Sequence, residues 1–369
     1  MIESKPSPSP FRRWSTRRQA SVYIAITIIT FFLVVLPLPQ RYDIRPDIVE
    51  QVTDIAKAHL PGSKYEPSSL ETTKAKFAYA TFLGPNPSQD QEKDINDDKY
   101  FVAARLLAYQ LLHASETRTT HDYPFIVLVS EGVSEVKRER LRKDGAIVWE
   151  RELVDAAWIN TPVPGWRTVL TKLRLWELTQ FDRICFLDGD TVLAKPLDAV
   201  FEDPAAAHPK MTDTKPKAIK PDEGPLPESY LYAGIQEIAP VHQYPPTEEH
   251  HDWPNYWYLN AGFFVMQPSL DVLAYYLSLL DVPNKFDAGL PEQNLLNYAH
   301  RPDGNMPWTH LDTKWNMHFV TWDDLQGGVH SLHANFWKPS DERLVPFLLQ
   351  WRWRMEGFFE GRDRGLFGE

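Results

Sequence analysis

The sequence has a single cysteine, few glycines for its length and a deficit of positive charge. Its 369 residues include one cysteine, 17 glycines and 31 prolines, and the net charge is −11. The lone Cys185 excludes an intrachain disulfide and a zinc site built from cysteines. It lies in the apolar run ICFL, which predicts a buried thiol. Because nucleic-acid phosphates require a basic surface, an acidic chain of this kind is not expected to bind nucleic acid.

The N-terminus departs from this acidic character. The first twenty residues carry five Lys or Arg side chains and one Glu, and the stretch from Gln19 to Gln40 has no charged residue. Such an apolar run is long enough to span a bilayer, and the basic residues before it predict a cytosolic N-terminus. We therefore expect a cytosolic basic tail at 1–19, a transmembrane signal anchor at 20–38 and a stem at 39–75. A cleaved signal peptide is the alternative, but PLPQRYD offers no small-residue cleavage site.

From residue 76 to 342, apolar strands alternate with helices. Because each strand is continuously apolar, the pattern predicts an α/β fold with a mostly parallel sheet that is covered on both faces. The expected strands are KFAYATFL, FIVLV, AIVW, ICFLD and LNAGFFVMQPS. The expected helices are DDKYFVAARLLAYQLLHA, VSEVKRERLRKDG closed by Gly145, residues 166–180, SLDVLAYYLSLL with Ser269 as N-cap, and PEQNLLNYAH with Pro291 at its first position.

Two further segments differ in composition from this alternating pattern. Residues 204–254 contain ten prolines and are expected to be an irregular insertion in the domain. Its end, HHDWPNYWY, is rich in aromatic residues and histidines, and His250 and His251 are weak candidates as metal ligands. Residues 343–369 are expected to form a C-terminal amphipathic helix and tail.

Two aspartates follow the run ICFL, separated by one glycine. If the strand continues through them, Asp188 and Asp190 project to the same side, and Gly189 leaves room for a ligand. Two carboxylates directed at one point suit Mg²⁺ or Mn²⁺, whose charge would offset their repulsion. An isolated Asp-x-Asp also fits a solvated surface turn. The motif and its four preceding apolar residues also fit phosphatases with an aspartate nucleophile, although their motif usually lies early in the chain.

The Asp-x-Asp is one of several motifs that occur in a fixed order. LTKLRLWELTQFDRICFLDGDTVL is followed by NAGFFVMQPS, PEQNLLN, the pair Trp315-Asn316 and LHANFWKP. Together these motifs resemble glycosyltransferase family 8, the group of glycogenin and galactinol synthase, over about residues 76 to 340. The resemblance implies a GT-A-type fold with a single Rossmann-like sheet. It also implies an enzyme that moves a sugar from a UDP-sugar donor with retention of configuration in a Mn²⁺-dependent reaction, with Mg²⁺ as a possible substitute.

The resemblance also implies a role for individual residues. Asp188, Asp190 and His333 would hold the metal ion, with His330 as an alternative third ligand because a glycine of the family's histidine motif is missing here. Thr81 and Tyr100 would contact uridine. The other implied donor-binding residues are Lys172, Asp188, Gly189, Asn260, Gly262 and Lys338. The residues implied nearest the chemistry are Gln293, Glu292 and Lys172.

Several of these residues could instead have a purely structural role. Lys172 lies opposite the apolar positions Val169 and Leu173, as a solvated surface lysine would. Tyr100 could equally belong to the core, and Glu292 could simply favour a helix N-terminus. Gly262 could serve close backbone approach rather than chemistry.

The acceptor is the least defined partner. No tyrosine occurs between residues 311 and 334, which argues against self-glucosylation of the glycogenin kind. A membrane anchor and a luminal catalytic domain instead favour a single-pass type II protein of the Golgi membrane, resembling fungal members of the wider group. We expect it to transfer glucose, N-acetylglucosamine or galactose to a glycan, glycolipid or glycoprotein. A non-catalytic scaffold that binds nucleotide sugars is the alternative.

Overall fold

The computed structural model describes residues 70, 73–85, 94–162, 164–214 and 219–365. The chain divides into two units, Met1–His59 and Leu60–Glu369, and all described residues lie in the second unit. The predicted basic tail, the predicted anchor and nearly all of the predicted stem lie outside the described residues. Within the described ranges, no helix is long and apolar enough to cross a membrane.

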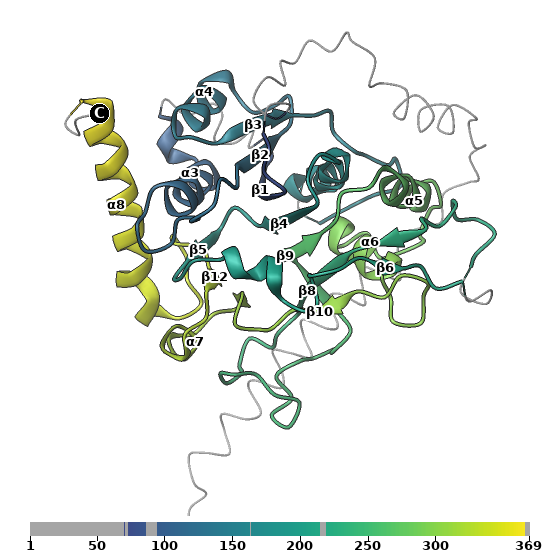
Figure 1. The fold of residues 1–369 in the computed structure, drawn as a ribbon. Helices are drawn as coiled ribbons and strands as arrows, with labels where there is room; N and C mark the ends of the chain where they lie inside the picture. Colours follow the sequence, from purple (N-terminus) through teal and green to yellow (C-terminus); the bar gives the residue numbers. More distant parts are fainter. Residues whose placement is uncertain (1–69, 71–72, 86–93, 163, 215–218, 366–369) are drawn as a thin grey trace, which may run out of the picture. The chain divides into compact units, whose positions relative to one another are not determined.

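Seven strands form the main sheet, in the order β10-β8-β9-β4-β1-β2-β3 (Figure 1). Strands β3, β2, β1 and β4 are parallel to one another, and β10 is parallel to β8, whereas β9 is antiparallel to both β4 and β8. The strands are β1 (Phe77–Leu83), β2 (Phe125–Val129), β3 (Ile147–Glu150), β4 (Arg183–Leu187), β8 (Tyr232–Gln236), β9 (Leu259–Met266) and β10 (Thr309–His310).

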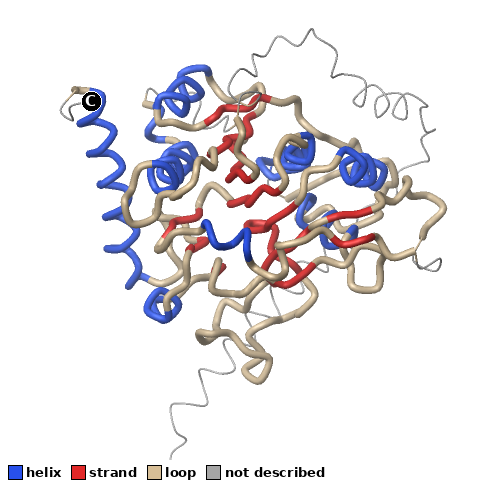
Figure 2. Tube along the Cα trace, in the orientation of Figure 1, coloured by secondary structure: helices blue, strands red, loops and turns tan. Residues whose placement is uncertain are grey.

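Two small sheets and the helices complete the described fold (Figure 2). The small sheets contain β5 (Thr191–Leu193), β11 (Met317–His318) and β12 (Ser331–His333), and β6 (Lys210–Met211) and β7 (Ser229–Tyr230). The α-helices are α3 (Lys99–Leu112), α4 (Glu135–Lys143), α5 (Leu270–Leu280), α6 (Pro291–Ala299), α7 (Trp322–Gly327) and α8 (Val345–Asp363). The 3-10 helices are η1 (Ile95–Asp97), η2 (Pro164–Glu177), η3 (Asp198–Glu202) and η4 (Glu342–Leu344).

Both faces of the main sheet are buried, because side chains alternate between two apolar cores along each strand. On β4, Ile184 and Phe186 belong to the core that includes side chains of η2, α5 and α6. Cys185 and Leu187 belong to the opposite core, with side chains of α3 and α4. The predicted burial of Cys185 is therefore confirmed.

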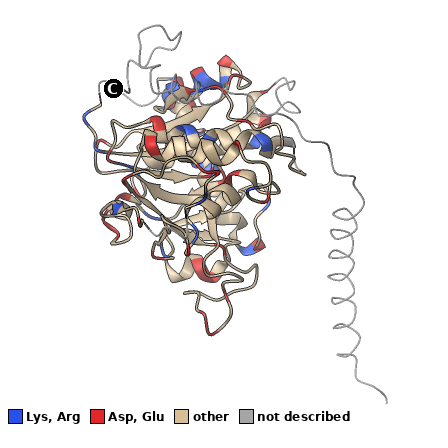
Figure 3. Ribbon diagram, turned by 90° about the vertical axis from the view of Figure 1, so that its right-hand side faces the viewer, with Lys and Arg blue, Asp and Glu red and all other residues tan. Residues whose placement is uncertain are grey.

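Acidic and basic residues are interspersed along the ribbon in Figure 3.

Local sequence signals place several helix ends correctly. The Ser269 hydroxyl accepts a hydrogen bond from the Val272 N–H at 3.3 Å, and this caps α5 as predicted. Gly145 follows α4 with a φ of +103°, a left-handed conformation that glycine adopts without strain. The predicted C-terminal helix corresponds to α8, which buries a stripe of apolar side chains at Leu348, Trp351, Met355 and Phe359.

The predicted mostly parallel sheet is confirmed, and β9 is the antiparallel member of the main sheet; all eight residues of β9 are buried, so hydrophobicity does not reveal its direction. Three other sequence-based predictions about the fold are wrong in part. Residues 166–180, expected to be an ordinary helix, fall largely in the 3-10 helix η2. The segment 204–254 is not irregular throughout, because its apolar run YAGIQ forms the interior strand β8. The main sheet is also accompanied by two small sheets.

Candidate active site

The two aspartates lie in a turn between strands, not in an extended strand. β4 ends at Leu187 and β5 begins at Thr191, so Asp188 and Asp190 occupy the connection. The Thr191 N–H donates to the Asp188 carbonyl oxygen at 3.0 Å, and the Asp188 N–H donates to the Gly262 carbonyl oxygen at 2.8 Å. The argument from strand alternation therefore does not apply. The turn itself directs both carboxylates toward the same histidine.

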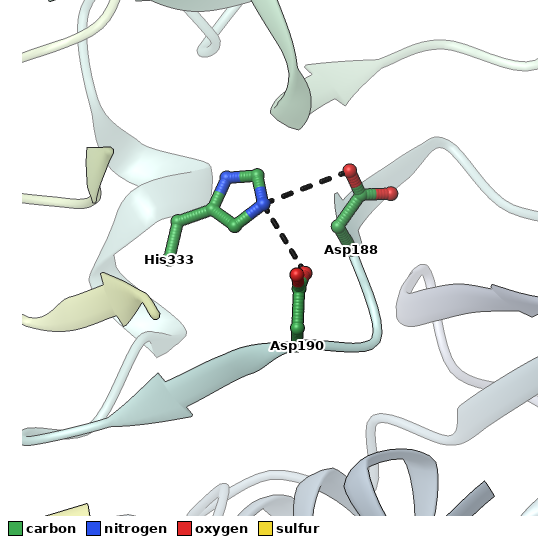
Figure 4. Close-up of side chains that lie close together, drawn as sticks. All are labelled: Asp188, Asp190 and His333. Carbon is green, nitrogen blue, oxygen red and sulfur yellow. Dashed lines mark ion pairs between the residues drawn. The ribbon is translucent and has the colours of Figure 1, made fainter. Parts of the chain in front are cut away.

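His333 faces both carboxylates from the end of β12. Strand β12 pairs with β5 in an antiparallel register that sets His333 opposite Thr191, the residue after Asp190. Its Nε2 lies 3.2 Å from Asp190 Oδ1 and 3.8 Å from Asp188 Oδ2 (Figure 4). His330 is directed elsewhere, since its Nδ1 lies 2.7 Å from a backbone carbonyl oxygen. The structure thus brings His333, rather than His330, to the aspartates.

The three side chains suit a divalent cation. One ligand atom from each of Asp188, Asp190 and His333 lies within 4.8 Å of the others, and no other such group occurs in the described part of the chain. Two carboxylate oxygens and an imidazole nitrogen suit Mn²⁺, whereas Mg²⁺ prefers oxygen ligands throughout. The residues present therefore fit the metal ion that the family resemblance implies.

The electrostatics of the three side chains support this assignment. Burial disfavours an imidazolium, but the carboxylates of Asp190 and Asp188 outweigh it and raise the pKa of His333 to about 9. Burial likewise opposes the charge of Asp190, but His333 outweighs it and lowers the pKa of Asp190. The two carboxylates thus favour a positive charge at this position. A bound cation would supply that charge and would require the neutral ring.

Substitution of the two histidines separates the alternative third ligands. We expect His333→Ala to weaken Mn²⁺ binding by at least about tenfold, because one of three protein ligands is lost. We expect His330→Ala to leave the affinity within about twofold, since its ring lies outside the cluster. Titration of the free Mn²⁺ signal by electron paramagnetic resonance measures both. A larger loss from His330→Ala would overturn the assignment.

Gly262 on β9 lies directly against the His333 ring. A Cβ atom at this position would lie 2.2 Å from His333 Cε1 and 2.6 Å from His333 Nδ1, closer than non-bonded atoms approach. The backbone at Gly262 therefore does make a close approach, as considered above, and its partner is the His333 ring. The absence of a side chain at Gly262 lets the imidazole reach the aspartates.

Gly262→Ala is expected to displace the His333 ring and thereby weaken Mn²⁺ binding by at least about tenfold. The crowding should also lower the free energy of unfolding by about 1–3 kcal/mol. Gly357→Ala is the matched control, because a Cβ atom there meets nothing within 4 Å and the residue lies inside α8. The control should leave Mn²⁺ binding unchanged. Wild-type Mn²⁺ affinity in Gly262→Ala would contradict the packing argument.

Lys172 on η2 is buried beside two carboxylates. Its Nζ lies 2.7 Å from Asp188 Oδ1 and 3.3 Å from Glu292 Oε1, and the residue is only 5% exposed. Burial opposes the lysine charge, but Asp188 and Glu292 outweigh it and raise the pKa of Lys172 above its usual value. The interpretation of Lys172 as a solvated surface lysine is therefore wrong. Its contact with Asp188 joins it directly to the cluster of Asp188, Asp190 and His333.

Glu292, in the first turn of α6, is the second partner of this lysine. Burial raises the pKa of Glu292 to about 7, and the negative charge of Asp188 adds to the rise while Lys172 opposes it. A single lysine does not neutralise two neighbouring carboxylates, so Glu292 is the one that takes up a proton most readily. Its side chain does more than favour a helix N-terminus.

Glu292→Gln is expected to raise the free energy of unfolding at pH 8, measured by urea denaturation in the presence of chelator. The folded pKa of about 7 exceeds the reference value of 4.5, so the wild type loses stability as the pH rises between these values. Glutamine does not ionise and avoids this loss, which we expect to be about 1–3 kcal/mol. The gain should vanish at pH 4. A gain that is independent of pH, or a loss at pH 8, would refute the explanation.

Gln293, the next residue on α6, is held against β9. Its Oε1 accepts a hydrogen bond from the Ala261 N–H at 3.0 Å, and its Nε2 donates to the Tyr258 hydroxyl at 3.2 Å. Asn260 is also fixed, since its Oδ1 accepts from the Gly262 N–H at 2.9 Å. The structure thus places the predicted residues Asn260, Gly262 and Gln293 around the start of one strand.

The predicted uridine-binding residues lie near the aspartates. Tyr100, at the start of α3, is 51% exposed, and this excludes the core position that we considered. Its ring contacts Trp337 edge to face, with centroids 5.1 Å apart. Thr81 Oγ1 is buried without a hydrogen-bond partner among the described residues, and a Cβ at Gly189 would lie 3.8 Å from it. Lys338 is exposed beyond β12.

The sequence analysis missed two residues that line the same site. Glu237 Oε2 accepts from Asn260 Nδ2 at 2.9 Å, and Glu237 Oε1 lies 2.5 Å from His318 Nδ1. The rings of His318 and His333 lie 4.9 Å apart. Glu237 follows the apolar run of β8 as Asp188 follows that of β4, and this signal could have revealed it. His318 lies in the two-residue strand β11, which has no sequence signature.

Comparison with known proteins gives relatives but no matching family model. The uncharacterised protein C4C3.09 of Schizosaccharomyces pombe is 33% identical over 301 residues, which cover 74% of this chain and 76% of that protein. Galactinol synthase 1 of Solanum lycopersicum is 29% identical over 235 residues, with coverages of 61% and 60%. Glycogenin-1 of Mus musculus is 27% identical over 205 residues, with coverages of 54% and 47%.

The similarity to galactinol synthase 1 and glycogenin-1, together with an α/β fold whose central strand β4 ends at an acidic cluster, supports a glycosyltransferase. The chain belongs to the same family as C4C3.09 of Schizosaccharomyces pombe. Its similarity to galactinol synthase 1 and glycogenin-1 supports a glycosyltransferase family 8-like family.

Proposed function

We propose that the protein is a GT-A-type, Mn²⁺-dependent retaining glycosyltransferase that uses a UDP-sugar donor. The observation that carries the proposal is that Asp188 belongs to two groups of charged side chains. It contacts the buried Lys172, and it also lies in the cluster with Asp190 and His333. A solvated turn would have no need of a buried lysine. Asp188 lies where β4 ends, and the carboxyl ends of parallel strands are the usual place for ligands in α/β sheets.

Asp188, Asp190 and His333 would hold Mn²⁺, with Mg²⁺ as a possible substitute. The bound ion would stabilise the negative charge of the departing diphosphate as a Lewis acid. Lys172 fixes the orientation of Asp188 through the contact with its Oδ1, and the other oxygen, Oδ2, faces His333. A protonated lysine has three N–H donors, and two of them face Asp188 and Glu292, so one remains for a phosphate oxygen.

Other side chains near the aspartates would contact the nucleotide-sugar donor. The exposed ring of Tyr100 would stack on uracil, and Thr81 Oγ1 would gain a hydrogen-bond partner from the nucleoside. Gly189 would allow the nucleotide to approach the turn closely. Lys338 would contact the diphosphate, and Asn260 would orient the donor sugar.

Retention of configuration requires either a covalent sugar intermediate or attack from the face that the phosphate leaves. Gln293 is a poor nucleophile, because an amide oxygen is weakly basic and this one already accepts a hydrogen bond from Ala261. We therefore propose front-face attack. The bond from the acceptor oxygen to the anomeric carbon forms as the bond to the UDP oxygen breaks, and the acceptor proton passes to that departing oxygen.

The cellular setting is part of the proposal. An anchor at residues 20–38 would make the protein a single-pass type II component of the Golgi membrane with a luminal catalytic domain. Its substrates would be UDP-glucose, UDP-N-acetylglucosamine or UDP-galactose, and a glycan, glycolipid or glycoprotein hydroxyl.

Calorimetric titration of the full-length protein with UDP tests the donor site. With Mn²⁺ present we expect UDP to bind at least about tenfold more tightly than in chelator, because a cation held by the carboxylates would offset the negative charge of the diphosphate. Equal affinity under both conditions, in a protein shown to be folded by circular dichroism, would contradict the proposed site.

A further inference from the structure

A group of aromatic side chains beside the site takes no part in the proposed reaction. Tyr256 and Trp257, just before β9, are 41% and 45% exposed. Tyr256 stacks on His310, with ring centroids 4.4 Å apart and an interplanar angle of 24°, so one of its faces is covered. The ring of Trp257 is nearly perpendicular to that of Tyr256, at 88°. We call Tyr256, Trp257 and His310 the aromatic corner.

Two neighbouring tryptophans hold the aromatic corner in place. Trp308, which is 2% exposed, donates from Nε1 to the Trp257 carbonyl oxygen at 3.2 Å, and its ring centroid lies 4.0 Å from that of His310. Trp253 contacts Tyr256 edge to face at 5.5 Å. A fixed set of exposed aromatic rings loses little conformational entropy when it binds a ligand.

The aromatic corner continues directly into the candidate active site. Trp257 precedes Asn260 by three residues, so their Cα atoms lie within about 11 Å of each other. Between them, the Tyr258 hydroxyl receives the hydrogen bond from Gln293. His310 lies on β10, which runs parallel to β8, so it lies toward the same end of the sheet as Glu237. A molecule bound in the corner would therefore extend toward the residues around the reacting centre.

We propose that the aromatic corner binds a sugar ring of a carbohydrate acceptor. This role rests on the transferase function proposed above and narrows the acceptor to one with a pyranose next to the receiving hydroxyl. The C–H groups of a pyranose face carry partial positive charge and pack favourably on the negative face of an aromatic ring. The near-perpendicular rings of Tyr256 and Trp257 offer such a ring two contact surfaces.

Polar groups in the corner favour a sugar over an acyl chain or an acidic peptide. Burial, aided by Lys210, lowers the pKa of His310 to about 4, so its ring is neutral at physiological pH. Trp253 Nε1 and His310 Nε2 have no hydrogen-bond partner among the described residues. Both atoms are already buried, and sugar hydroxyls that reached them after a side-chain rotation would supply the missing hydrogen bonds, which an acyl chain cannot do.

The test measures binding of defined sugars to the full-length protein. The probes are methyl glycosides of glucose, galactose, mannose and N-acetylglucosamine, and their disaccharides. Dodecanol and a glutamate-rich peptide serve as non-carbohydrate probes, and binding of all probes is followed by saturation-transfer NMR. We expect at least one glycoside to bind, Trp257→Ala to weaken it by at least about tenfold, and Trp257→Phe to stay within about threefold because a ring face is kept. Trp353→Ala, at a 63% exposed tryptophan of α8, is the control.

Titration with UDP and Mn²⁺ separates this proposal from the proposed function. Normal UDP binding in Trp257→Ala, together with lost sugar binding, supports the aromatic corner as a separate acceptor subsite. Sugar binding that depends on Trp257 in a protein that does not bind UDP would support the corner while the transferase function fails. Binding of none of the glycosides, binding of dodecanol or peptide alone, or an equal effect of Trp257→Ala and Trp353→Ala would overturn the proposal.

Discussion

Replacement of Lys172 by methionine is expected to lower the free energy of unfolding by about 3–5 kcal/mol and to abolish sugar transfer. Methionine keeps the length of the side chain but removes the charge that lies between Asp188 and Glu292. The two carboxylates then face each other without a cation, and Glu292 takes up a proton to relieve the repulsion. Because that proton is available at low pH, the loss of stability should be larger at pH 8 than at pH 5.

Urea denaturation at the two pH values, in chelator, measures this effect. Lys143→Met serves as the control, because this lysine is 56% exposed and its ion pair with Asp363 lies on the surface. The control should change stability by less than about 1 kcal/mol, as is usual for surface ion pairs. Equal effects of the two substitutions would show that the buried charge of Lys172 does not support the site.

Asp190→Ala is expected to lower the rate of sugar transfer by at least about a thousandfold. The substitution removes one of the two carboxylates that we propose hold the metal ion, and the charge stabilisation that a metal ion supplies to a leaving group amounts to several kcal/mol. The folded structure should survive, because the remaining carboxylate, Asp188, keeps its contact with Lys172. Loss of activity should therefore accompany a wild-type circular dichroism spectrum.

Asp303→Ala provides the matched control for this substitution. Its side chain is 85% exposed, and it lies outside the acidic cluster. Sugar transfer by this variant should equal that of the wild type. Unchanged metal-dependent turnover in Asp190→Ala would refute the assignment of the metal ligands.

Much of the fold was predictable because hydrophobic runs and end signals are local. The strands around Phe125 and Ile184 and the cap at Ser269 follow from patterns of a few residues. The order of the motifs also indicated which residues the fold would gather, and Asp188, Asp190 and His333 do lie together. Their metal-binding role itself stays a prediction.

What the sequence did not reveal depends on contacts between distant segments. The antiparallel direction of β9 was hidden because the strand is buried on both faces. The burial of Lys172 depends on Glu292, which lies far along the chain on another helix. The packing of Gly262 against His333 and the pairing of Glu237 with His318 likewise join elements whose proximity only the folded chain defines.

The most direct test of the central claim is the release of UDP from a panel of UDP-sugars by the full-length protein, first with Mn²⁺ and then with chelator. Transferases of the proposed type can transfer the sugar to water, so no acceptor need be known. We predict release from UDP-glucose, UDP-N-acetylglucosamine or UDP-galactose that stops in chelator and in Asp190→Ala. Release that persists in chelator, or no release from any donor by a folded protein that also fails to bind UDP with Mn²⁺, would contradict the account.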